Sequence, residues 1–109
     1  MLWRVDLREA DLSYAALQGA DLDHDRLRGA NLRHARLEAA SLHEANLRNA
    51  DLTCASLRRA KPDHADLSGA NLCAADLTGA SLWGAQLAGA RLEDSVGTPD
   101  KQLKNAHLT

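Results

Sequence analysis

The sequence of 109 residues predicts an all-β solenoid, in which the chain winds in stacked turns around one narrow apolar core. Leucine recurs at every fifth position from Leu2 to Leu92, and Pro62 is the only residue that interrupts this series of 19 positions. Alanine stands two residues before the central position of each repeat from position 5 to position 90, except at Val5 and Asp25. Six of the seven glycines fall two residues after the central leucine. These three patterns indicate one structural unit of five residues, repeated along nearly the whole chain.

A period of five fits neither regular secondary structure. On an α-helix, steps of about 100° per residue would scatter the leucines around the whole surface. On a flat strand, an odd step would send alternate leucines to opposite faces. Leucine and alanine can share one interior only if the chain bends once in every repeat. The result is a solenoid with short extended sides and three outward-facing positions per repeat.

The outward-facing positions supply the bend. Asp, Asn and Ser side chains bond to nearby backbone and favour turns, and glycine fits where the backbone must turn without a Cβ clash. We therefore expect the same corner position in every repeat. Asp, Asn or Ser precedes the central residue at positions 6, 11, 21, 31, 41, 46, 51, 56, 66, 71, 76 and 81.

The tandem phrase Ala-(Asp/Asn)-Leu-x-x, most regular over residues 65–79, resembles the repeat of the pentapeptide-repeat proteins. The resemblance covers about residues 4–94. It implies a right-handed quadrilateral β-helix with four pentapeptides per coil, and therefore just under five coils. The period alone does not set the number of sides.

The first residues of the sequence predict an open end of the coil. Leu2 and Trp3 already follow the five-residue repeat, and no capping segment precedes them. An uncovered coil is an unpaired strand edge, and solenoids normally need a cap. We expect either self-association through the uncapped N-terminal coil or a longer protein of which this chain is a piece.

Two interior positions depart from the repeat. Asp25 replaces an alanine, and a buried carboxylate without a partner would be costly, so we expect it near a corner where it accepts backbone or arginine hydrogen bonds. Pro62 replaces a leucine and lacks the N–H that a ladder needs. It predicts a local bulge or a lost hydrogen bond between rungs.

The repeat stops after Leu92. Thr98 fits a helix N-cap, Pro99 the first helical position and Asp100 the first turn. We expect a short helix over residues 99–107 that caps the coil; the alternative is a phase-shifted repeat through residues 106–108. The predicted domains are a β-helix over residues 1–94 and a C-terminal turn with a short capping helix over residues 95–109.

The charge of the chain is small overall but banded. The formal net charge of −2 argues against a general nucleic-acid-binding protein. Residues 1–25 carry six acidic and two basic side chains, residues 26–61 eight basic and three acidic, and residues 62–109 six acidic and three basic. The rod therefore has a basic belt between two acidic ends.

Targeting signals are not evident in the sequence. It has no apolar run of membrane-spanning length and no signal peptide. Two cysteines without an export signal indicate a reducing compartment. We expect one domain, located in the cytoplasm and not associated with a membrane.

With four repeats per coil, residues 20 apart stack into columns. On one face acid and imidazole alternate, and His24, His43, His64 and Glu44 are candidates for a metal or acid–base site. We favour the alternative of a solvent-exposed ladder of charge-paired rungs, each pair contributing about a few tenths of a kcal/mol. Exposed flat faces rarely enclose a metal or form a pocket.

A second face brings Cys54 and Cys73 to diagonal positions on adjacent rungs, near His34. A disulfide or a metal site would use these residues. The sequence lacks a paired Cys-x-x-Cys and a fourth ligand, which favours free surface thiols.

A third face stacks Arg8, Arg28 and Arg48, with Arg26 alongside. Such a column would bind an acidic partner. The alternative is an ordinary solvated face of mixed charge, since Asp6 and other polar residues lie nearby.

We predict a non-catalytic pentapeptide-repeat scaffold that mediates protein–protein interaction with an unidentified partner, because solenoids present long rigid surfaces. We find no nucleophile–base pair and no phosphate loop, so we expect no enzymatic activity, no catalytic residues, no cofactor and no metal. Exposed tryptophan is frequent at interface hot spots, although two tryptophans at opposite ends of one column would also simply cover rung edges. The candidate interaction surface comprises Trp3, Trp83, Arg26, Arg28 and Arg48.

The alternative function comes from the resemblance. Pentapeptide-repeat proteins associated with quinolone resistance imitate duplex DNA and occupy gyrase, so the chain would be a DNA-mimicking topoisomerase-binding protein. The charge banding favours the scaffold, because imitation of phosphates needs a continuous negative field. We expect no direct binding of nucleic acid.

Overall fold

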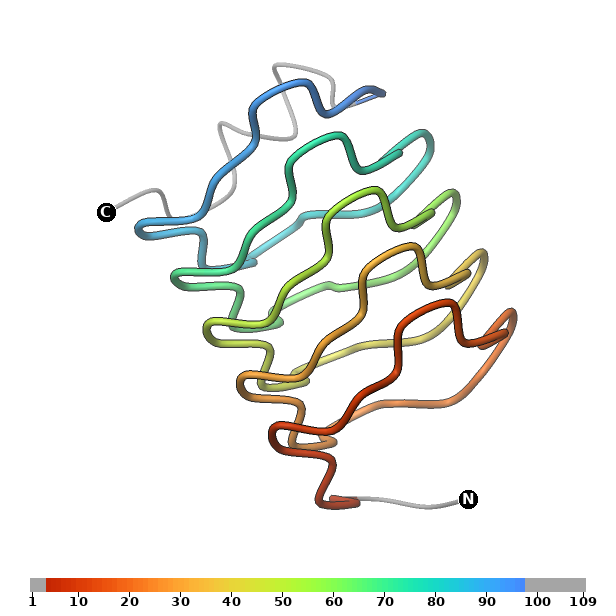
Figure 1. Cartoon of the computed structure of the whole chain (residues 1–109), viewed down its shortest axis with the longest axis vertical. Coiled ribbons are helices and arrows are strands. Elements are labelled where there is room, and N and C mark those ends of the chain that lie inside the picture. Colours follow the sequence, from red (N-terminus) through yellow and green to blue (C-terminus); the bar gives the residue numbers. More distant parts are fainter. Residues whose placement is uncertain (1–3, 98–109) are drawn as a thin grey trace.

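The computed structural model describes residues 4–97, which stack in four-sided coils (Figure 1). No residue in this range belongs to a helix or to a strand longer than one residue. The chain instead forms isolated parallel β-bridges, from Asp6–Arg26 to Asp76–Val96, and each joins residues 20 apart. Twenty residues are four repeats, so each coil has four sides, as the resemblance implied.

One tight turn per repeat makes the corners. From Ala10 to Ala90, the N–H of the alanine-position residue donates to the carbonyl of the central residue three positions earlier, as in Ala30 to Leu27 at 3.0 Å. The residue just before that alanine has a positive φ in every repeat from Arg4 to Asp94. A positive φ at the third residue alone is the pattern of a type II turn. The prediction of one corner position per repeat is confirmed.

The corner geometry does not depend on glycine. Six of the corner residues are glycine, and the other thirteen adopt φ values of 56–63° with a side chain attached. This backbone region costs an ordinary residue about 1–2 kcal/mol. The stacking of the coils therefore imposes the turn even where the local sequence resists it.

Hydrogen bonds between rungs hold the coils together. The N–H of each central leucine from Leu7 to Leu77 donates to a carbonyl on the next coil, as in Leu32 to Asp51 at 2.7 Å. The residue before the leucine donates in the opposite direction, as in Asn31 to Ala10 at 2.8 Å. Each side of a coil is thus tied to the coils before and after it.

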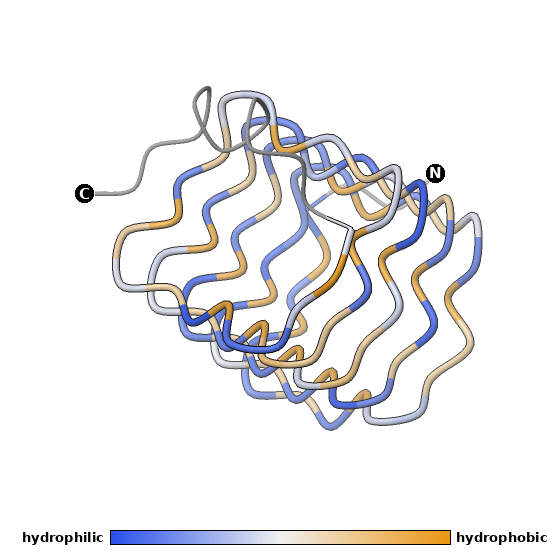
Figure 2. Ribbon diagram, turned by 90° about the horizontal axis from the view of Figure 1, so that it is seen from above, coloured by the Kyte–Doolittle hydropathy of each residue, from blue (hydrophilic) through white to orange (hydrophobic). Residues whose placement is uncertain are grey.

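The interior is a continuous column of leucine and alanine. Leucine and alanine side chains at interior positions from Leu27 to Leu87 are at most 3 % exposed. Hydrophobic and hydrophilic residues accordingly alternate along each coil in Figure 2. In the first coil, Leu7, Leu12 and Leu17 are only partly buried. The core leucines of this coil are therefore less deeply buried than those of the coils that follow.

Asp25 lies inside the coil, where the repeat usually has alanine, and is 1 % exposed. Its Oδ1 accepts a hydrogen bond from the N–H of Val5 on the preceding coil at 2.9 Å. The expectation that a backbone group compensates this carboxylate is confirmed.

Pro62 is fully buried and breaks one rung without shifting the register. Lys61 still pairs with Ser41, but no bridge joins Lys61 to Ser81, and the next bridge on that side of the break is Asp66–Gln86. Because proline has no N–H, it cannot donate to the carbonyl of Ser81 as a leucine would. Of the two predicted effects, the lost hydrogen bond occurs, and the chain forms no bulge because the 20-residue spacing is kept on both sides.

Two expectations lie outside the described residues: the capping helix over residues 99–107 and the position of Trp3. Within residues 4–97 the chain has no helix that is long and apolar enough to cross a membrane.

Candidate functional site

Apart from the buried Asp25, the polar side chains of the described residues lie on the four outer faces, because leucine and alanine fill the interior. We name three faces by their side chains. The histidine face comprises the outward residues of the repeats centred on positions 22, 42, 62 and 82; the arginine face those centred on 7, 27, 47, 67 and 87; and the cysteine face those centred on 12, 32, 52, 72 and 92. The fourth face follows the repeats centred on 17, 37, 57 and 77.

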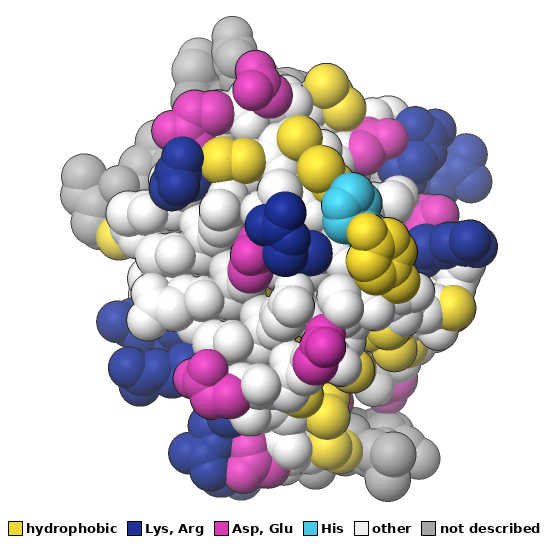
Figure 3. Space-filling model, viewed as in Figure 1, with side chains coloured by type: hydrophobic (Ala, Val, Ile, Leu, Met, Phe, Trp, Pro, Cys, Tyr) yellow, Lys and Arg dark blue, Asp and Glu magenta, His cyan; other side chains and the backbone are white. Residues whose placement is uncertain are grey.

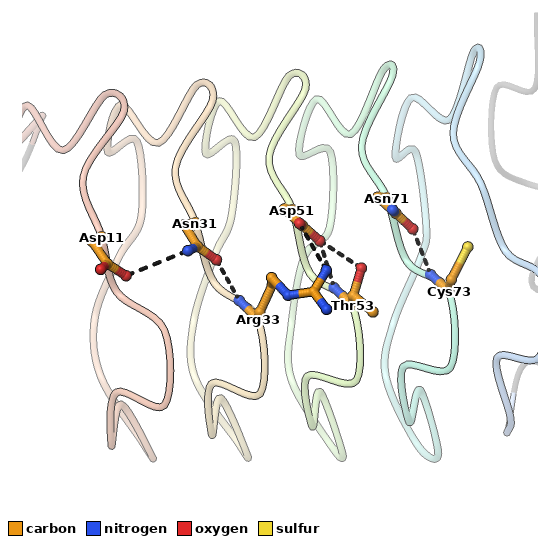
Figure 4. Close-up of polar contacts among 7 residues, drawn as sticks. All are labelled: Asp11, Asn31, Arg33, Asp51, Thr53, Asn71 and Cys73. Carbon is orange, nitrogen blue, oxygen red and sulfur yellow. Dashed lines mark hydrogen bonds and ion pairs between the residues drawn. The ribbon is translucent and has the colours of Figure 1, made fainter.

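Asp and Asn side chains form a ladder along the cysteine face, at the position before each leucine (Figure 4). The carboxylate of Asp51 accepts from the N–H of Thr53 at 3.0 Å and from its hydroxyl at 2.5 Å. Asn31 accepts in the same way from the N–H of Arg33, and Asn71 from that of Cys73. These contacts confirm that the residue before the leucine bonds to nearby backbone.

The ladder lowers carboxylate pKa values. Burial raises the pKa of Asp51, but hydrogen bonds from Thr53 and the ion pair with Arg33 outweigh it, so the net pKa is lowered. On the fourth face, hydrogen bonds from Thr78 are the main cause of a lowered pKa of Asp76, and Arg58 adds to them. These contacts keep both carboxyl groups charged in mildly acidic solution.

Ion pairs between rungs follow a fixed register that the sequence analysis missed. Arg33 reaches Asp51 at 3.2 Å on the cysteine face. On the other faces, Arg48 reaches Asp66 at 3.3 Å, and Arg58 reaches Asp76 at 3.1 Å. Each arginine follows a leucine and meets the carboxylate 18 residues later, on the next rung. The sequence signal for these ion pairs was an Arg–Asp spacing of 18 residues, which places the two side chains on neighbouring rungs of a 20-residue coil.

The histidine face brings together the acid and imidazole groups that the sequence placed there. The Glu44 carboxylate lies 3.3 Å from Nδ1 of His24 and 3.6 Å from Nε2 of His43. The His43 ring meets those of His24 and His64 edge to face, with centroids 6.0 and 5.6 Å apart. Among the residues that the structure describes, no three His, Cys, Asp or Glu side chains are placed to hold a metal ion. Imidazole and carboxylate groups therefore lie in contact along this face.

The cysteine face places Cys54 and Cys73 as diagonal neighbours, as predicted: the N–H of Cys54 donates to the carbonyl of Cys73 at 3.0 Å. Both are free thiols. The Cys73 thiol donates to Oε2 of Glu93 at 3.1 Å, and this hydrogen bond is the main cause of its raised pKa. Tyr14 stacks parallel on His34, with ring centroids 4.8 Å apart. In the view of Figure 3, a histidine lies beside hydrophobic side chains.

The arginine face contains paired and unpaired guanidinium groups. Arg8 binds Asp6 through two hydrogen bonds of 2.8 and 2.7 Å, which lower the pKa of that carboxyl group far below its usual range. Arg48 binds Asp66. Arg26 and Arg28 are exposed, and neither makes an ion pair within 4 Å with another described residue.

The predicted surface residues do not form one cluster. Arg26, Arg28 and Arg48 share the arginine face, whereas Trp83 lies on the histidine face and is 55 % exposed. An open depression on the arginine face is lined by Asp6, Arg8, Glu9 and Arg28.

Comparison with known proteins gives a match to the family model of pentapeptide repeats, in eight copies over residues 1–24, 26–61 and 63–94. The two breaks fall at residues 25 and 62, the interior positions that hold Asp25 and Pro62. No match is found among curated protein sequences.

Solved structures of similar proteins include HetL from the cyanobacterium Nostoc sp. strain PCC 7120, described as involved in the regulation of heterocyst differentiation. It is 37% identical, with a TM-score of 0.67 over 94% of this chain and 48% of HetL. A pentapeptide repeat protein of the Arabidopsis thaliana thylakoid lumen is 33% identical, with a TM-score of 0.65 over 89% of this chain and 70% of that one. A second Nostoc pentapeptide repeat protein is 34% identical, with a TM-score of 0.58 over 97% and 86% of the two chains. The chain thus spans about half the length of HetL.

Proposed function

Because the chain belongs to the pentapeptide-repeat family, whose fold is a right-handed quadrilateral β-helix, we propose that it is a non-catalytic scaffold that binds another protein. One observation carries the proposal. Side chains fill the interior, while the polar groups stand outside in ladders with a fixed 20-residue register. A rigid ladder of this kind suits a broad contact with a macromolecule better than the enclosure of a small substrate.

We place the contact surface at Arg26, Arg28 and Arg48 on the arginine face and at Trp83 on the histidine face, with Trp3 as a further contact. Trp83 presents an indole ring that is 55 % exposed. Exposed tryptophan and arginine are the side chains most often found at interface hot spots. The proposal includes the cytoplasm as the location of the complex, in keeping with two free thiols.

A second contact in the proposal is between two copies of the chain. Leu7, Leu12 and Leu17 leave the apolar core partly open at the N-terminal coil. In the proposed contact, the second copy also pairs with the backbone edge of this coil. The proposed unit is therefore a β-helix domain of residues 1–94, just under five coils long, covered by a second copy at its N-terminal end and by the segment of residues 95–109, with its capping helix, at the other.

The scaffold is tested with a purified partner. Tagged full-length chain is cross-linked in cell extract, the captured proteins are identified by mass spectrometry, and each is purified and titrated against the chain by calorimetry. We expect saturable binding that Trp83→Ala weakens about tenfold at unchanged thermal stability. The scaffold is refuted if every purified candidate fails to bind.

Self-association is measured separately by light scattering over a range of concentrations. We expect a dimer that Leu12→Lys converts to monomer, because the substitution places a charge on the partly open end of the core. A monomer at every concentration would contradict this contact.

A further inference from the structure

Ion pairs between rungs assign a carboxylate partner to three arginines on the outside of the coil. An arginine that follows a leucine is matched to the carboxylate 18 residues later in three cases, on three different faces. The pairs are Arg33–Asp51, Arg48–Asp66 and Arg58–Asp76. The positive charge of each of these arginines is balanced by a carboxylate on the next rung.

The arginine face breaks this register at two successive rungs. The residue 18 positions after Arg8 is Arg26, which has the same charge, and Arg8 turns back to Asp6 instead. The residue 18 positions after Arg28 is Asn46, which carries no charge. Arg26 and Arg28 consequently remain on one rung without an ion-pair partner within 4 Å among the described residues. The second rung of the arginine face therefore presents two guanidinium groups without a direct ion pair, and the charge of Arg26 acts on Asp6 of the rung before it by lowering the pKa of that carboxyl group.

The two arginines also point the same way. They flank Leu27, whose side chain is buried in the core, so both project outward from one side of an extended segment. Residues at alternate positions of a strand lie about 6.6–6.8 Å apart. An extended peptide laid over this rung presents its own alternate side chains at the same spacing. Asp or Glu at alternate positions of such a peptide would meet both guanidinium groups, each of which can bind a carboxylate through two hydrogen bonds.

The charge around the rung favours a short acidic segment over a long polyanion. Asp6 and Glu9 lie on the rung before it, and Asp66 lies on the rung after Arg48. The acidic bands of residues 1–25 and 62–109 continue beyond these positions. A nucleic acid carries one charge per about 1.7 Å of duplex and would extend over both acidic ends. A peptide with two central carboxylates would not.

We infer that Arg26 and Arg28 are the docking site for an extended acidic segment of another protein, with Asp or Glu at alternate positions. This inference rests on the proposed scaffold function and names the chemistry of its partner. The depression lined by Asp6, Arg8, Glu9 and Arg28 gives the segment room beside the Arg28 guanidinium group. Asp6 and Glu9 border the site on one side and would favour a basic residue next to the acidic pair.

The test measures binding of a fluorescein-labelled peptide, Gly-Glu-Gly-Glu-Gly, to the full-length chain by fluorescence anisotropy at about 20 mM and about 150 mM salt. We expect the double variant Arg26→Gln/Arg28→Gln to weaken binding about fivefold or more, since two exposed ion pairs are lost. The matched control is Arg33→Gln/Arg58→Gln, which removes the same total charge from arginines that are already paired. We expect the control to change binding by less than about twofold at the higher salt concentration. Thermal melting followed by circular dichroism establishes that each variant is folded.

Three results would overturn the inference. Equal weakening by both double variants would show that only the total charge is sensed. Equal binding of a Gly-Gln-Gly-Gln-Gly peptide would show that carboxylates are not recognised. Tighter binding of a ten-base-pair DNA duplex than of the peptide, lost in Arg26→Gln/Arg28→Gln, would assign the site to nucleic acid.

Binding measurements with the natural partner distinguish failure of this docking site from failure of the proposed scaffold function. A purified partner that binds wild type and Arg26→Gln/Arg28→Gln equally would overturn the acidic docking site and leave the scaffold intact. If no purified candidate binds, the proposed scaffold function is refuted, regardless of the result of the peptide-binding measurement.

Discussion

Replacing Pro62 with leucine should stabilise the coil. Leucine restores an N–H that can donate to the carbonyl of Ser81, and one such hydrogen bond contributes about 0.5–1.5 kcal/mol. The side chains above and below it in the stack are leucines, Leu42 at 0 % and Leu82 at 1 % exposure, so a leucine between them has matching neighbours. Its extra methyl group adds about 0.8 kcal/mol of burial. Loss of the proline restriction on the unfolded chain subtracts about 0.4–1 kcal/mol.

The net expectation for Pro62→Leu is a gain of about 1 kcal/mol, or a rise in Tm of about 4 °C for a chain of this length. Thermal and urea unfolding, followed by circular dichroism, measure it. Pro62→Ala is the control: it restores the same N–H but removes apolar contacts, and should be less stable than Pro62→Leu by about 2 kcal/mol or more. A Pro62→Leu protein that melts at or below the wild-type temperature would refute the account of this rung.

Three further predictions address the corners, the acid ladder and the thiols. Ala39→Gly should raise the free energy of unfolding by up to about 1 kcal/mol, since glycine relieves a strained φ but loosens the unfolded chain. Gly19→Ala should lower the free energy of unfolding, because its positive φ strains a side chain even though the added Cβ meets no atom within 4 Å. Urea unfolding measures both variants, and no difference from wild type for either would show that the corners are unstrained. Stability should fall below about pH 4, because the lowered folded-state pKa of Asp51 stabilises the fold above the unfolded pKa, and this contribution is lost as the pH falls through the folded pKa. The Asp51→Asn variant should lose less stability than wild type over that pH range, and identical stability profiles of the two proteins would contradict the argument. Cys54 should react with an aromatic disulfide reagent faster than Cys73, whose pKa is raised; equal modification rates by mass spectrometry would count against the Cys73–Glu93 contact.

The repeat determined most of the fold because each residue type has one place in it. A five-residue period and elementary sterics were enough to predict the interior leucines and alanines, the corner two residues after each central leucine, and the hydrogen bonds that Asp and Asn make to nearby backbone. Even the irregular positions were foreseeable: Asp25 bonds to a backbone N–H, and Pro62 loses one rung bond. The number of sides was not in the period, since any bend once per repeat satisfies it, and came from the resemblance.

The surface was harder to predict, because a column of residues does not show which neighbour a long side chain selects. The sequence grouped Arg8, Arg28 and Arg48 as one basic stack. In the structure, Arg8 and Arg48 are neutralised by Asp6 and Asp66, while Arg28 is not. The direction in which each arginine side chain extends along the stack decides this difference, and it is known only from the tertiary structure.

The sequence by itself therefore determined the solenoid, its core and its corners, because backbone sterics and burial act within one repeat or between copies of it. The tertiary structure alone decided how charges pair between rungs, since the 18-residue register depends on the lean of each side chain toward the next coil. That register leaves Arg26 and Arg28 on one rung without an ion pair to another described residue, which the spacing of the sequence alone does not show.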